Sequence, residues 1–563
     1  MRYWRLWLVV AVIAVVFIAL AVRMIYLMVW ERPFLVKQAN QRILRTQVIP
    51  ASRGMIYSQD HKPLAISIPK ATIWANPHQF NWNSRSLQQL SSALNIKQQH
   101  LKHRLQKNDD KYFIYLKRNA DQSVGKAVKK MHLNGVYVKT QYQRYYPQGR
   151  VTSHVIGYTN IDNQGQAGLE KSFDHWLKGH PGKRVIVKDR LGHVVSQVGV
   201  KKQTHPGHDL TLSIHSKIQF LAYQVLRKTV EHYKADSGSV VVMDPRNGQI
   251  LAMANQPDYN PNHSYRAPYG RYRNRAVTDV YEPGSTMKVF SIMNALKSGK
   301  YTPDMKIDTS PGWFMLGNNE VKDEINNGVL TVKQILQKSS NVGVAKMTLS
   351  LPAQDLLAML HRVGFGQRTQ SGFPGERAGQ VPSRSKWRPF DLATLAFGYG
   401  ITVTPLQITH AYTAIANHGR LCPATFLKHS PTNPCPQVLP ESLADKMLHM
   451  MTYVLKPGGT GTRAAIPGYK VGGKTGTAFI AGPNGYNKHH HVASFIGIAP
   501  VDHPRLVVSV IITNPQGKRD YGGIVAAPAF AKIMGGALRI LKIPPDSSQH
   551  DLKQTARPYP EAN

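Results

Sequence analysis

The sequence predicts a multi-domain α+β protein. It has a single N-terminal transmembrane helix, a mixed domain after it, and a C-terminal domain with a five-stranded antiparallel sheet flanked by helices. Three observations lead to this prediction. A long apolar run opens the chain, residues 60–230 mix short strand-like and helical patterns, and strand-like segments after residue 237 stand on both sides of a central helical block. Separated strands with helices between them are typical of such a layered domain.

The composition of the 563 residues supports folded domains. Hydrophobic residues make up 42% of the chain and aromatic residues 9%, which is enough for sizeable cores and excludes a mainly disordered chain. At roughly 150 residues per domain, the length fits three or four domains. No repeat of about 20–50 residues indicates a solenoid. The two cysteines exclude a disulfide-rich scaffold and a cysteine-built zinc site.

The net charge is strongly positive. There are 71 Lys and Arg residues against 31 Asp and Glu residues, a formal charge of +40. The basic residues are scattered, and pairs such as Lys129-Lys130 and Lys201-Lys202 are the densest local groups. The sequence also lacks a nucleic-acid-binding motif. We therefore interpret the charge as that of a protein beside an anionic surface, with nucleic-acid binding as the alternative.

The N-terminal apolar segment predicts a membrane anchor. Residues 6–22 form an unbroken apolar run of 17 residues. Such a helix spans roughly 26 Å, slightly less than the ~30 Å of a hydrocarbon core. Arg23 interrupts the run, and the chain is then apolar again to Trp30. Because an arginine side chain can snorkel to the interface, we expect a tilted anchor over residues 6–30.

The flanking charges set the expected orientation of the anchor. Arg2 and Arg5 precede the run, and the positive-inside rule therefore places residues 1–5 in the cytoplasm as a short tail. No second long apolar run follows, so we expect the rest of the chain outside the cytoplasm. A signal peptide cleaved after Ala21 is the alternative, although the apolar character continues for nine residues past this position, apart from Arg23.

The two cysteines would lie in an oxidising compartment. Cys422 and Cys435 are 13 residues apart in a Pro-rich loop. A disulfide between them would stabilise the protein by roughly 3 kcal/mol in the chain-entropy model. Two free thiols are the alternative.

We expect three regions after the anchor: a first domain at residues 31–230, a second at residues 235–545, and a disordered tail at residues 546–563. In the second domain, Asn247-Gly248 between two strand-like segments predicts a β-hairpin. The other expected strands are 111–118, 135–146, 183–188, 209–214, 469–479, 491–498 and 505–512, and the expected helices include 86–94, 97–106, 219–233 and 528–541.

The first chemical motif is Ser285-Thr286-Met287-Lys288, which follows a Pro-Gly turn signal. On a helix, residues i and i+3 share a face, so the Lys288 amine can reach the Ser285 hydroxyl. A serine is a weak nucleophile until an adjacent base activates it, and a lysine serves as that base when burial or a neighbouring cation lowers its pKa. S-x-x-K occurs four times in the chain, so this motif has little weight alone.

The second motif, Ser339-Ser340-Asn341, lies 54 residues further on. Ser339 can relay a proton, and Asn341 can orient a lysine or a substrate amide. A polar turn at a helix end has the same composition, and this is the alternative for the motif taken by itself.

The third motif, Lys474-Thr475-Gly476-Thr477, lies in a strand-like segment. Glycine permits the close approach of another backbone. A lysine and two hydroxyls beside such a strand suit a peptide that ends in a carboxylate and docks along the strand. The three motifs in this order form the set shared by penicillin-binding proteins and serine β-lactamases.

The chain as a whole resembles the class B penicillin-binding proteins, the monofunctional D,D-transpeptidases of bacterial cell-wall synthesis. Asn341 favours the division-specific (penicillin-binding protein 3, FtsI-type) members, because elongation-type members usually have Asp there. Ser58-Gln59-Asp60-His61 departs from the Asp-Arg-x-Gly of the family. The resemblance, which reaches about Arg539, also rests on Arg53-Gly54-Met55-Ile56, Pro63-Leu64-Ala65, Arg144-Tyr145-Tyr146-Pro147, His154, Gly157, Gly165, Gly168-Leu169-Glu170, Asp189-Arg190-Leu191-Gly192, residues 397–407 and residues 521–530.

The resemblance implies a serine acyl-enzyme mechanism. Ser285 attacks the penultimate D-Ala carbonyl of a stem peptide and releases the terminal D-Ala, while Lys288 takes the Ser285 proton. Ser339 passes a proton towards the leaving amine, and Asn341 hydrogen-bonds Lys288 and the substrate amide. Lys474 supplies positive potential. The amine of a second stem peptide then attacks the acyl-enzyme and forms the cross-link.

The resemblance also implies the substrate-binding residues. Thr475 and Thr477 hold the substrate carboxylate, with Gly476 between them in the binding strand. The backbone N–H groups of Ser285 and Thr477 form the oxyanion hole, where one donor is typically worth ~3–4 kcal/mol in the transition state. β-Lactams mimic D-Ala-D-Ala and leave a stalled acyl-enzyme on Ser285.

By resemblance, residues 31–230 are an elongated pedestal of the penicillin-binding protein dimerisation type, and residues 235–545 a transpeptidase domain like the serine β-lactamases. The protein is then expected in the inner membrane at the division septum, with a cytoplasmic N-terminus and a periplasmic catalytic domain. The expected partners are stem peptides of lipid-linked or nascent glycan strands, β-lactams, and divisome proteins including a SEDS-family glycosyltransferase. No cofactor, metal or nucleic acid is expected.

Other interpretations stay open at this stage. His489-His490-His491 is expected in a solvated loop near the cleft, with a metal site as the alternative. A catalytically weak scaffold or β-lactam sensor would keep the same fold and motifs. A serine β-lactamase would have the same motifs but would release the acyl group rapidly to water.

Overall fold

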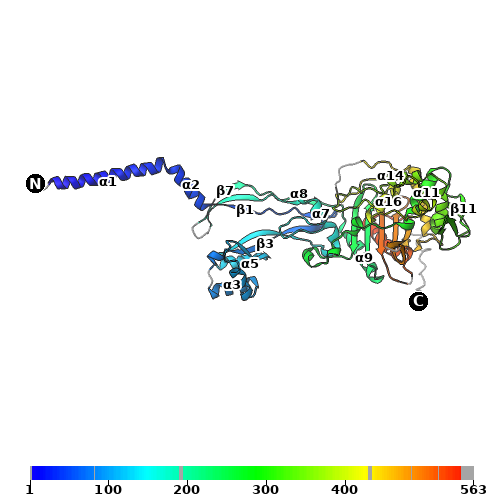
Figure 1. Ribbon diagram of the computed structural model, residues 1–563, viewed down its shortest axis with the longest axis horizontal. Coiled ribbons are helices and arrows are strands. Elements are labelled where there is room, and N and C mark those ends of the chain that lie inside the picture. The colour runs from blue at the N-terminus through cyan, green and yellow to red at the C-terminus, as the bar shows by residue number, and fades with distance from the viewer. Residues whose placement is uncertain are drawn as a thin grey trace. The chain divides into compact units, whose positions relative to one another are not determined.

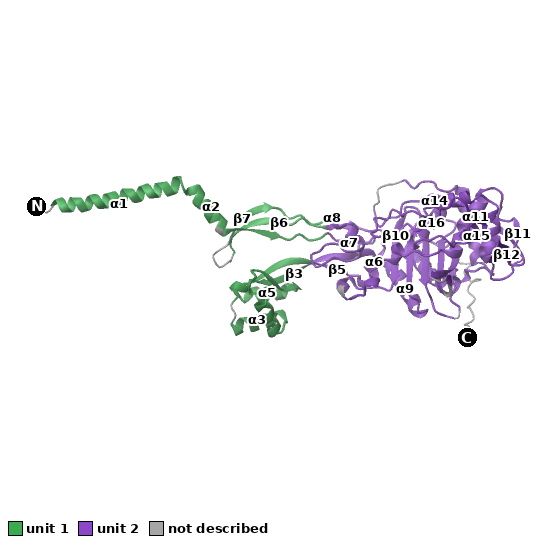
Figure 2. Ribbon diagram, viewed as in Figure 1, with its two compact units in different colours: residues 1–53, 69–142, 178–207 green, residues 54–68, 143–177, 208–563 purple. Residues whose placement is uncertain are grey.

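The computed structural model describes residues 3–80, 83–188, 194–428, 434–482, 485–517 and 519–546 (Figure 1). The chain forms two compact units, each made of several segments (Figure 2). Unit 1 comprises residues 1–53, 69–142 and 178–207, and unit 2 comprises residues 54–68, 143–177 and 208–563. The expected tail after Asp546, the Asp189–Gly192 segment and Arg2 lie outside the described residues.

The N-terminus of unit 1 is a long apolar helix. Helix α1 (Tyr3–Val29) has a mean hydropathy of 3.0 in its most apolar window, and none of its residues is buried. A helix of 27 residues is about 40 Å long, which is enough to cross a bilayer with tilt. Helix α2 (Arg32–Ile43) follows. A second helix passes the same length and composition test, α18 (Gly522–Ile540), but 61% of its window is buried in the core of unit 2.

The remainder of unit 1 contains a three-stranded antiparallel sheet and a small α/β lobe. The sheet has the order β1 (Leu44–Ile49), β6 (Gly182–Lys188), β7 (Val194–Lys202). In the lobe, leucines at helical spacing on the first two helices pack on the strands, so that one apolar face forms the core. The lobe consists of α3 (Ser84–Leu94), α4 (Gln98–Gln106), α5 (Gln122–Lys130), β4 (Ile114–Ala120), most of β5 (Val136–Tyr145) and the second half of β3 (Pro63–Ala75).

In unit 2, several segments quoted for the family resemblance meet around a buried ion pair. The Arg144 guanidinium donates to the Glu170 carboxylate at 2.5 Å, and both side chains are buried. Arg144 also donates to the Gly54 carbonyl at 2.7 Å. The elements nearby are β2 (Ile56–Tyr57), β8 (Leu210–Thr211), α6 (Ser153–Ile156), α7 (Gly168–Ser172) and α8 (Asp174–Leu177).

The main feature of unit 2 is the predicted five-stranded antiparallel sheet, which the structure confirms. Helices α9 (Ser216–His232) and α18 cover one face, while α16 (Pro405–Ala416) packs on β9 and β17 from the other side. The sheet order is β10 (Gln249–Gln256), β9 (Ser237–Asp244), β17 (Leu506–Thr513), β16 (Gly485–Ala499), β15 (Gly472–Gly482). Strand β15 is therefore an edge strand, and one side of its backbone is available to a ligand.

Helix α18 begins earlier than the sequence pattern predicts. The sequence predicts a helix near residues 528–541, whereas α18 starts at Gly522 and continues through Pro528. Its first two turns bury Val525, Ala526 and Ala527 in the core, which offsets the lost backbone hydrogen bond of the proline.

The helical block between the two halves of the sheet forms the second large core of unit 2. It also contains two small hairpins, β11 (Lys306–Asp308) with β14 (Val329–Thr331) and β12 (Trp313–Leu316) with β13 (Asn319–Lys322). Its helices are α10 (Arg275–Thr278), α11 (Lys288–Lys297), α12 (Val332–Lys338), α13 (Asn341–Leu349), α14 (Ala353–Arg362), α15 (Pro389–Ala396) and α17 (Glu441–Met451).

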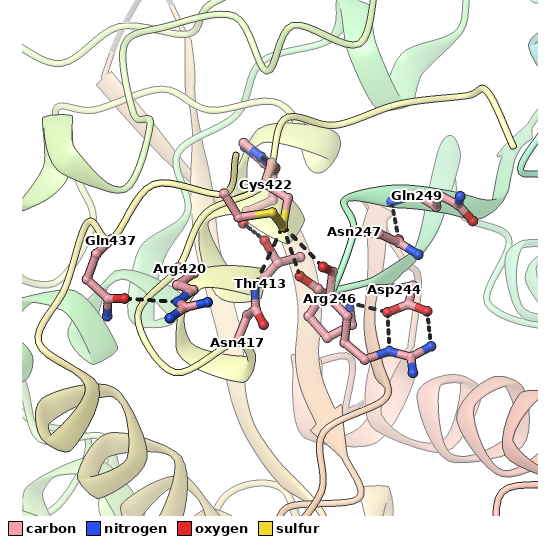
Figure 3. The surroundings of a disulfide bond; sticks show 12 residues. Asp244, Arg246, Asn247, Gln249, Thr413, Asn417, Arg420, Cys422 and Gln437 are labelled. Carbon is pink, nitrogen blue, oxygen red and sulfur yellow. Dashed lines mark hydrogen bonds and ion pairs between the residues drawn. A yellow bond between two sulfur atoms is a disulfide. The ribbon is translucent and has the colours of Figure 1, made fainter. Parts of the chain in front are cut away.

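The two cysteines form a disulfide, Cys422–Cys435, in the segment between α16 and α17. Figure 3 shows Cys422 facing the turn between β9 and β10, where its Sγ lies 3.4 Å from the Arg246 carbonyl oxygen. Gly248 in this turn has φ +71, and a Cβ there would lie 2.1 Å from the Pro423 carbonyl oxygen. The disulfide therefore fixes a loop that packs against the end of the main sheet.

Replacing both cysteines by serine is expected to destabilise unit 2 by about 3 kcal/mol, because the unfolded chain regains the entropy of the open loop. The measurement is the melting temperature of the full chain in detergent, with and without reductant. Reductant should lower the melting temperature of the wild type and leave that of the double variant unchanged. Equal melting temperatures for both proteins without reductant would contradict the expectation.

Candidate active site

The position of Ser285 is fixed by close backbone packing. Ser285 lies in a short 3-10 helix, Gly284–Met287, directly before α11. Gly284 has φ +54, and a Cβ at Gly398 would lie 2.2 Å from the Gly284 carbonyl oxygen. The buried Tyr412 of α16 donates its hydroxyl to the Thr286 carbonyl at 2.8 Å. Ser285 itself is partly exposed, whereas its neighbours Thr286 and Met287 are buried.

Lys288 begins helix α11 and is fully buried. Its Nζ donates to the carbonyl oxygen of Ser339 and to the Ser339 Oγ, at 3.2 Å for the hydroxyl. Burial lowers the pKa of Lys288 to about 7, against the opposing effect of the negative charges of Asp323 and Glu324. A lysine with this pKa is about half neutral at pH 7 and can accept a proton, as the predicted base must.

Ser339 lies in a strained backbone conformation at the end of α12. Its φ of 60 and ψ of 38 fall in the left-handed region, which non-glycine residues adopt at a cost of about 1–3 kcal/mol. Its Oγ accepts hydrogen bonds from Lys288 and, at 2.9 Å, from Lys474 Nζ. The structure thus brings one residue of each predicted motif, Lys288, Ser339 and Lys474, into direct contact.

Lys474 reaches the site from the edge strand β15. It is fully buried, and its Nζ also donates to the Thr475 carbonyl at 3.0 Å. Burial, together with the charge of Lys288, lowers the pKa of Lys474 well below its ordinary value. This lowered pKa opposes the predicted role of Lys474 as a source of positive potential. A bound carboxylate would favour the charged amine again.

The rest of the third motif places strand β15 tightly against the serine. A Cβ at Gly476 would lie 2.3 Å from Ser494 Oγ and 3.2 Å from the Pro283 carbonyl oxygen, so only glycine fits between β16 and the serine segment. The Thr475 hydroxyl lies 2.7 Å from the Thr460 hydroxyl. Thr477 is partly exposed and accepts a hydrogen bond from the Gly522 backbone at 3.2 Å.

Two contacts of the motif residues differ from the prediction. Within the described residues, the Lys288 amine donates to Ser339 and makes no hydrogen bond with Ser285. The second difference is at Asn341. Its Nδ2 donates to the Lys322 carbonyl at 2.8 Å, and its backbone N–H donates to the Asp323 carboxylate. Within the part of the chain that the structure describes, Lys288 donates to Ser339 and not to Asn341. The predicted contact of Asn341 with a substrate amide stays a prediction.

A cavity of about 540 Å³ lies near the serine segment, but Ser285, Lys288, Ser339 and Lys474 are not among the residues that line it. Its lining includes Tyr281 and Glu282 ahead of Ser285, and Ala478 and Phe479 after the third motif. The Glu282 carboxylate accepts hydrogen bonds from Tyr486 and from the Gly400 backbone, and burial raises its pKa. The hydrogen bonds of Glu282 thus link β16 to the turn that supports Gly284.

The histidine triplet lies in strand β16, so the expectation of a solvated loop is wrong. His491 is buried, and its ring lies 3.0 Å from the Asp520 carbonyl oxygen, while the side chain of His489 is outside the described residues. Among the residues described, His418, Glu441 and Asp445 are close enough to share an ion. They are largely exposed, and His418 pairs directly with Asp445 at 2.8 Å, so we assign no metal to them.

Sequence reasoning missed three residues that support the site: Thr460, Tyr412 and Asp323. Thr460 contacts the Thr475 hydroxyl, Tyr412 fixes the Thr286 carbonyl, and Asp323 accepts from the second motif. None of them belongs to a local motif, and their roles depend on contacts between segments far apart in the chain. The pattern of the sequence contains no signal for such contacts.

Comparisons with known proteins agree with this geometry. Residues 238–535 match the family described as "Penicillin binding protein transpeptidase domain", and residues 48–212 match "Penicillin-binding Protein dimerisation domain". The chain is 40% identical over 554 residues to the protein named peptidoglycan D,D-transpeptidase FtsI of Escherichia coli, covering 97% of this chain and 93% of that one. It is 41% identical over 547 residues to a probable peptidoglycan D,D-transpeptidase, PenA, of Neisseria meningitidis, covering 96% and 93%.

Solved structures show the same likeness. A peptidoglycan synthetase from Bifidobacterium adolescentis superposes with a TM-score of 0.71 at 25% identity, covering 90% of this chain and 99% of that one. The transpeptidase domain of Burkholderia pseudomallei penicillin-binding protein 3 gives a TM-score of 0.55 at 38% identity, covering 60% and 98%. The chain therefore belongs to the penicillin-binding protein transpeptidases, and within them to the class B proteins of the FtsI type.

Replacing Gly476 by alanine is expected to slow acylation by a penicillin about 100-fold, because the new methyl group displaces β15 from the serine segment by a fraction of an ångström or more. The measurement is the second-order rate constant for labelling by a fluorescent penicillin. Gly482→Ala in the same strand is the control, because among the described residues the atom nearest to its Cβ would be the Gly485 carbonyl oxygen at 3.6 Å. Equal rates for the two variants would contradict this account of the strand.

Acylation is also expected to depend on pH through Lys288. The pKa of about 7 means that protons bind the amine as the pH falls below 7, and the protonated amine cannot accept the serine proton. The rate constant should therefore rise with pH, reach half its maximum near pH 7 and level off above pH 8. A rate constant that is flat between pH 5.5 and 8.5 would show that Lys288 is not the titrating base.

Proposed function

We propose that this FtsI-type D,D-transpeptidase cross-links peptidoglycan through an acyl-enzyme on Ser285. The FtsI-type transpeptidases cross-link stem peptides in septal cell-wall synthesis, and β-lactams bind covalently to these enzymes. The observation that carries the assignment of the residues is the cluster in which Lys288 and Lys474 both donate to Ser339 Oγ beside the serine segment. A second hydroxyl held between two lysines of lowered pKa is suited to proton transfer.

The steps follow from the positions of these groups. The neutral amine of Lys288 takes the Ser285 proton as the hydroxyl attacks the penultimate D-Ala carbonyl. Ser339 then passes a proton from the lysine pair to the leaving D-Ala amine. Backbone N–H groups of Ser285 and Thr477 hold the oxyanion, and the amine of a second stem peptide resolves the acyl-enzyme into the cross-link.

The docking of the donor peptide follows from the edge position of β15. An extended peptide can pair with the free side of this strand and direct its terminal carboxylate towards Thr475, Gly476 and Thr477. The partly exposed Thr477 hydroxyl is the more accessible donor to the carboxylate, while Thr475 is buried and already contacts Thr460. We therefore assign the first contact with the carboxylate to Thr477.

The protein is membrane-anchored, with α1 as the anchor. We further propose that Arg2 and Arg5 keep the N-terminus in the cytoplasm, so that both units lie in the periplasm, and that the protein acts at the division septum. Divisome proteins, including a SEDS-family glycosyltransferase that supplies nascent strands, are the proposed partners. The proposed domain borders are 31–230 for the pedestal and 235–545 for the transpeptidase domain.

The test of the nucleophile is labelling of membranes with a fluorescent penicillin. Wild-type protein should give a covalent band near 63 kDa, and Ser285→Ala should give none. The same pair of chains should be compared for their ability to support cross-linking and division in cells lacking the native enzyme. A Ser285→Ala chain that still supports cross-linking would refute the proposed mechanism and indicate a scaffold or sensor.

A further inference from the structure

One carboxylate holds the backbone of the second motif. Asp323 directly follows strand β13, and its side chain accepts from the Ser340 hydroxyl at 2.5 Å, the Asn341 backbone N–H at 2.5 Å and the Val342 backbone N–H at 3.0 Å. The Ser340 hydroxyl accepts in turn from the Gly343 backbone at 2.9 Å. These donors belong to the first turn of α13, whose N–H groups have no partner within the helix.

The segment that carries Asp323 is itself fixed. Its backbone N–H donates to the Gly312 carbonyl at 2.8 Å, and the preceding Lys322 carbonyl accepts from the Asn341 amide at 2.8 Å. The hairpin β12–β13 is thus bonded to the second motif through two consecutive residues. A negative charge at the start of α13 also matches the positive end of the helix dipole.

This arrangement matters for catalysis because of the conformation of Ser339. On its N-terminal side, the Ser339 backbone N–H donates to the Ile335 carbonyl and ends α12. On its C-terminal side, Asp323 holds the next three residues. A strained left-handed residue keeps its geometry only when both neighbouring segments are constrained. If either constraint is lost, Ser339 can relax, and its Oγ leaves the two lysines.

We propose that Asp323 is a positioning residue for the transpeptidation reaction, which sets the Ser339 hydroxyl between Lys288 and Lys474 by capping α13. The proposal rests on the proposed roles of Ser285 and Ser339. The negative charges of Asp323 and Glu324 raise the pKa of Lys288. The charge of Lys288 lowers the pKa of Lys474, and the charge of Glu324 raises it. Removing the charge of Asp323 should therefore also make Lys288 a weaker base.

The test compares Asp323→Asn with wild type in the full chain, by the rate constant for acylation with a fluorescent penicillin. We expect at least a 10-fold loss at the high-pH plateau, because the amide cannot accept all of the hydrogen bonds. The half-maximal point should also move to lower pH, since Asp323 raises the pKa of Lys288. Glu320→Gln removes a charge from β13, where Glu320 pairs only with Lys322 among its described salt bridges, and should match wild type.

Misfolding is separated from positioning by two further measurements. A loss of folded protein lowers the amount labelled at saturation and leaves both the rate constant and its pH midpoint in place. The proposal predicts full labelling at saturation, with a lower rate constant and a shifted midpoint. Ser340→Ala removes the hydroxyl between Asp323 and Gly343, so its effect should be less than additive with Asp323→Asn. An additive double variant would contradict the shared network.

The outcomes distinguish this proposal from the proposed function. If wild type is labelled at Ser285 and Asp323→Asn has the same rate and pH profile, only the positioning role is refuted. If wild type is not labelled at Ser285, the proposed mechanism fails, and the positioning role fails with it.

Discussion

The burial of two lysine amines around one hydroxyl is the constraint on which the active site depends. An ammonium group loses several kcal/mol of hydration when it is buried, so the site stabilises the neutral form of Lys288 and brings its pKa to about 7. Burying the two amines without hydrogen-bond acceptors would cost further free energy. Ser339 supplies its Oγ to both, and its carbonyl to Lys288. Burial therefore lowers the pKa of this base, and the charges of Asp323 and Glu324 partly offset the effect.

Each element around the cluster has a feature that permits this close packing. Gly476 leaves room for Ser494 and the serine segment, and Gly398 leaves room for the Gly284 carbonyl. Helix α16 fixes the serine turn through Tyr412, and the edge position of β15 keeps one side of its backbone free for a peptide. The sheet, the helical block and the hairpin β12–β13 each contribute to a site that no single element could form.

Much of the fold and of the candidate site could be predicted from the sequence, for reasons that differ between features. The anchor, the hairpin at Asn247-Gly248 and the five strands follow from local apolar patterns, and the structure confirms the sheet. The three motifs are predictable because each is a short run with chemical meaning. The contacts of Asp323, Thr460 and Tyr412 are not, because they join residues 15 to 126 positions apart in the chain. The start of α18 was misplaced because the preference of Pro528 for a first turn is weaker than the burial of the two turns before it.

The most direct test of the account is to map the penicillin adduct on the unmodified protein by peptide mass spectrometry at several pH values. The account predicts a single adduct, on the peptide that contains Ser285, with an initial rate of formation that is half-maximal near pH 7. An adduct on another residue, or one whose initial rate does not fall as Lys288 becomes protonated, would contradict the claim that a buried neutral lysine activates this serine.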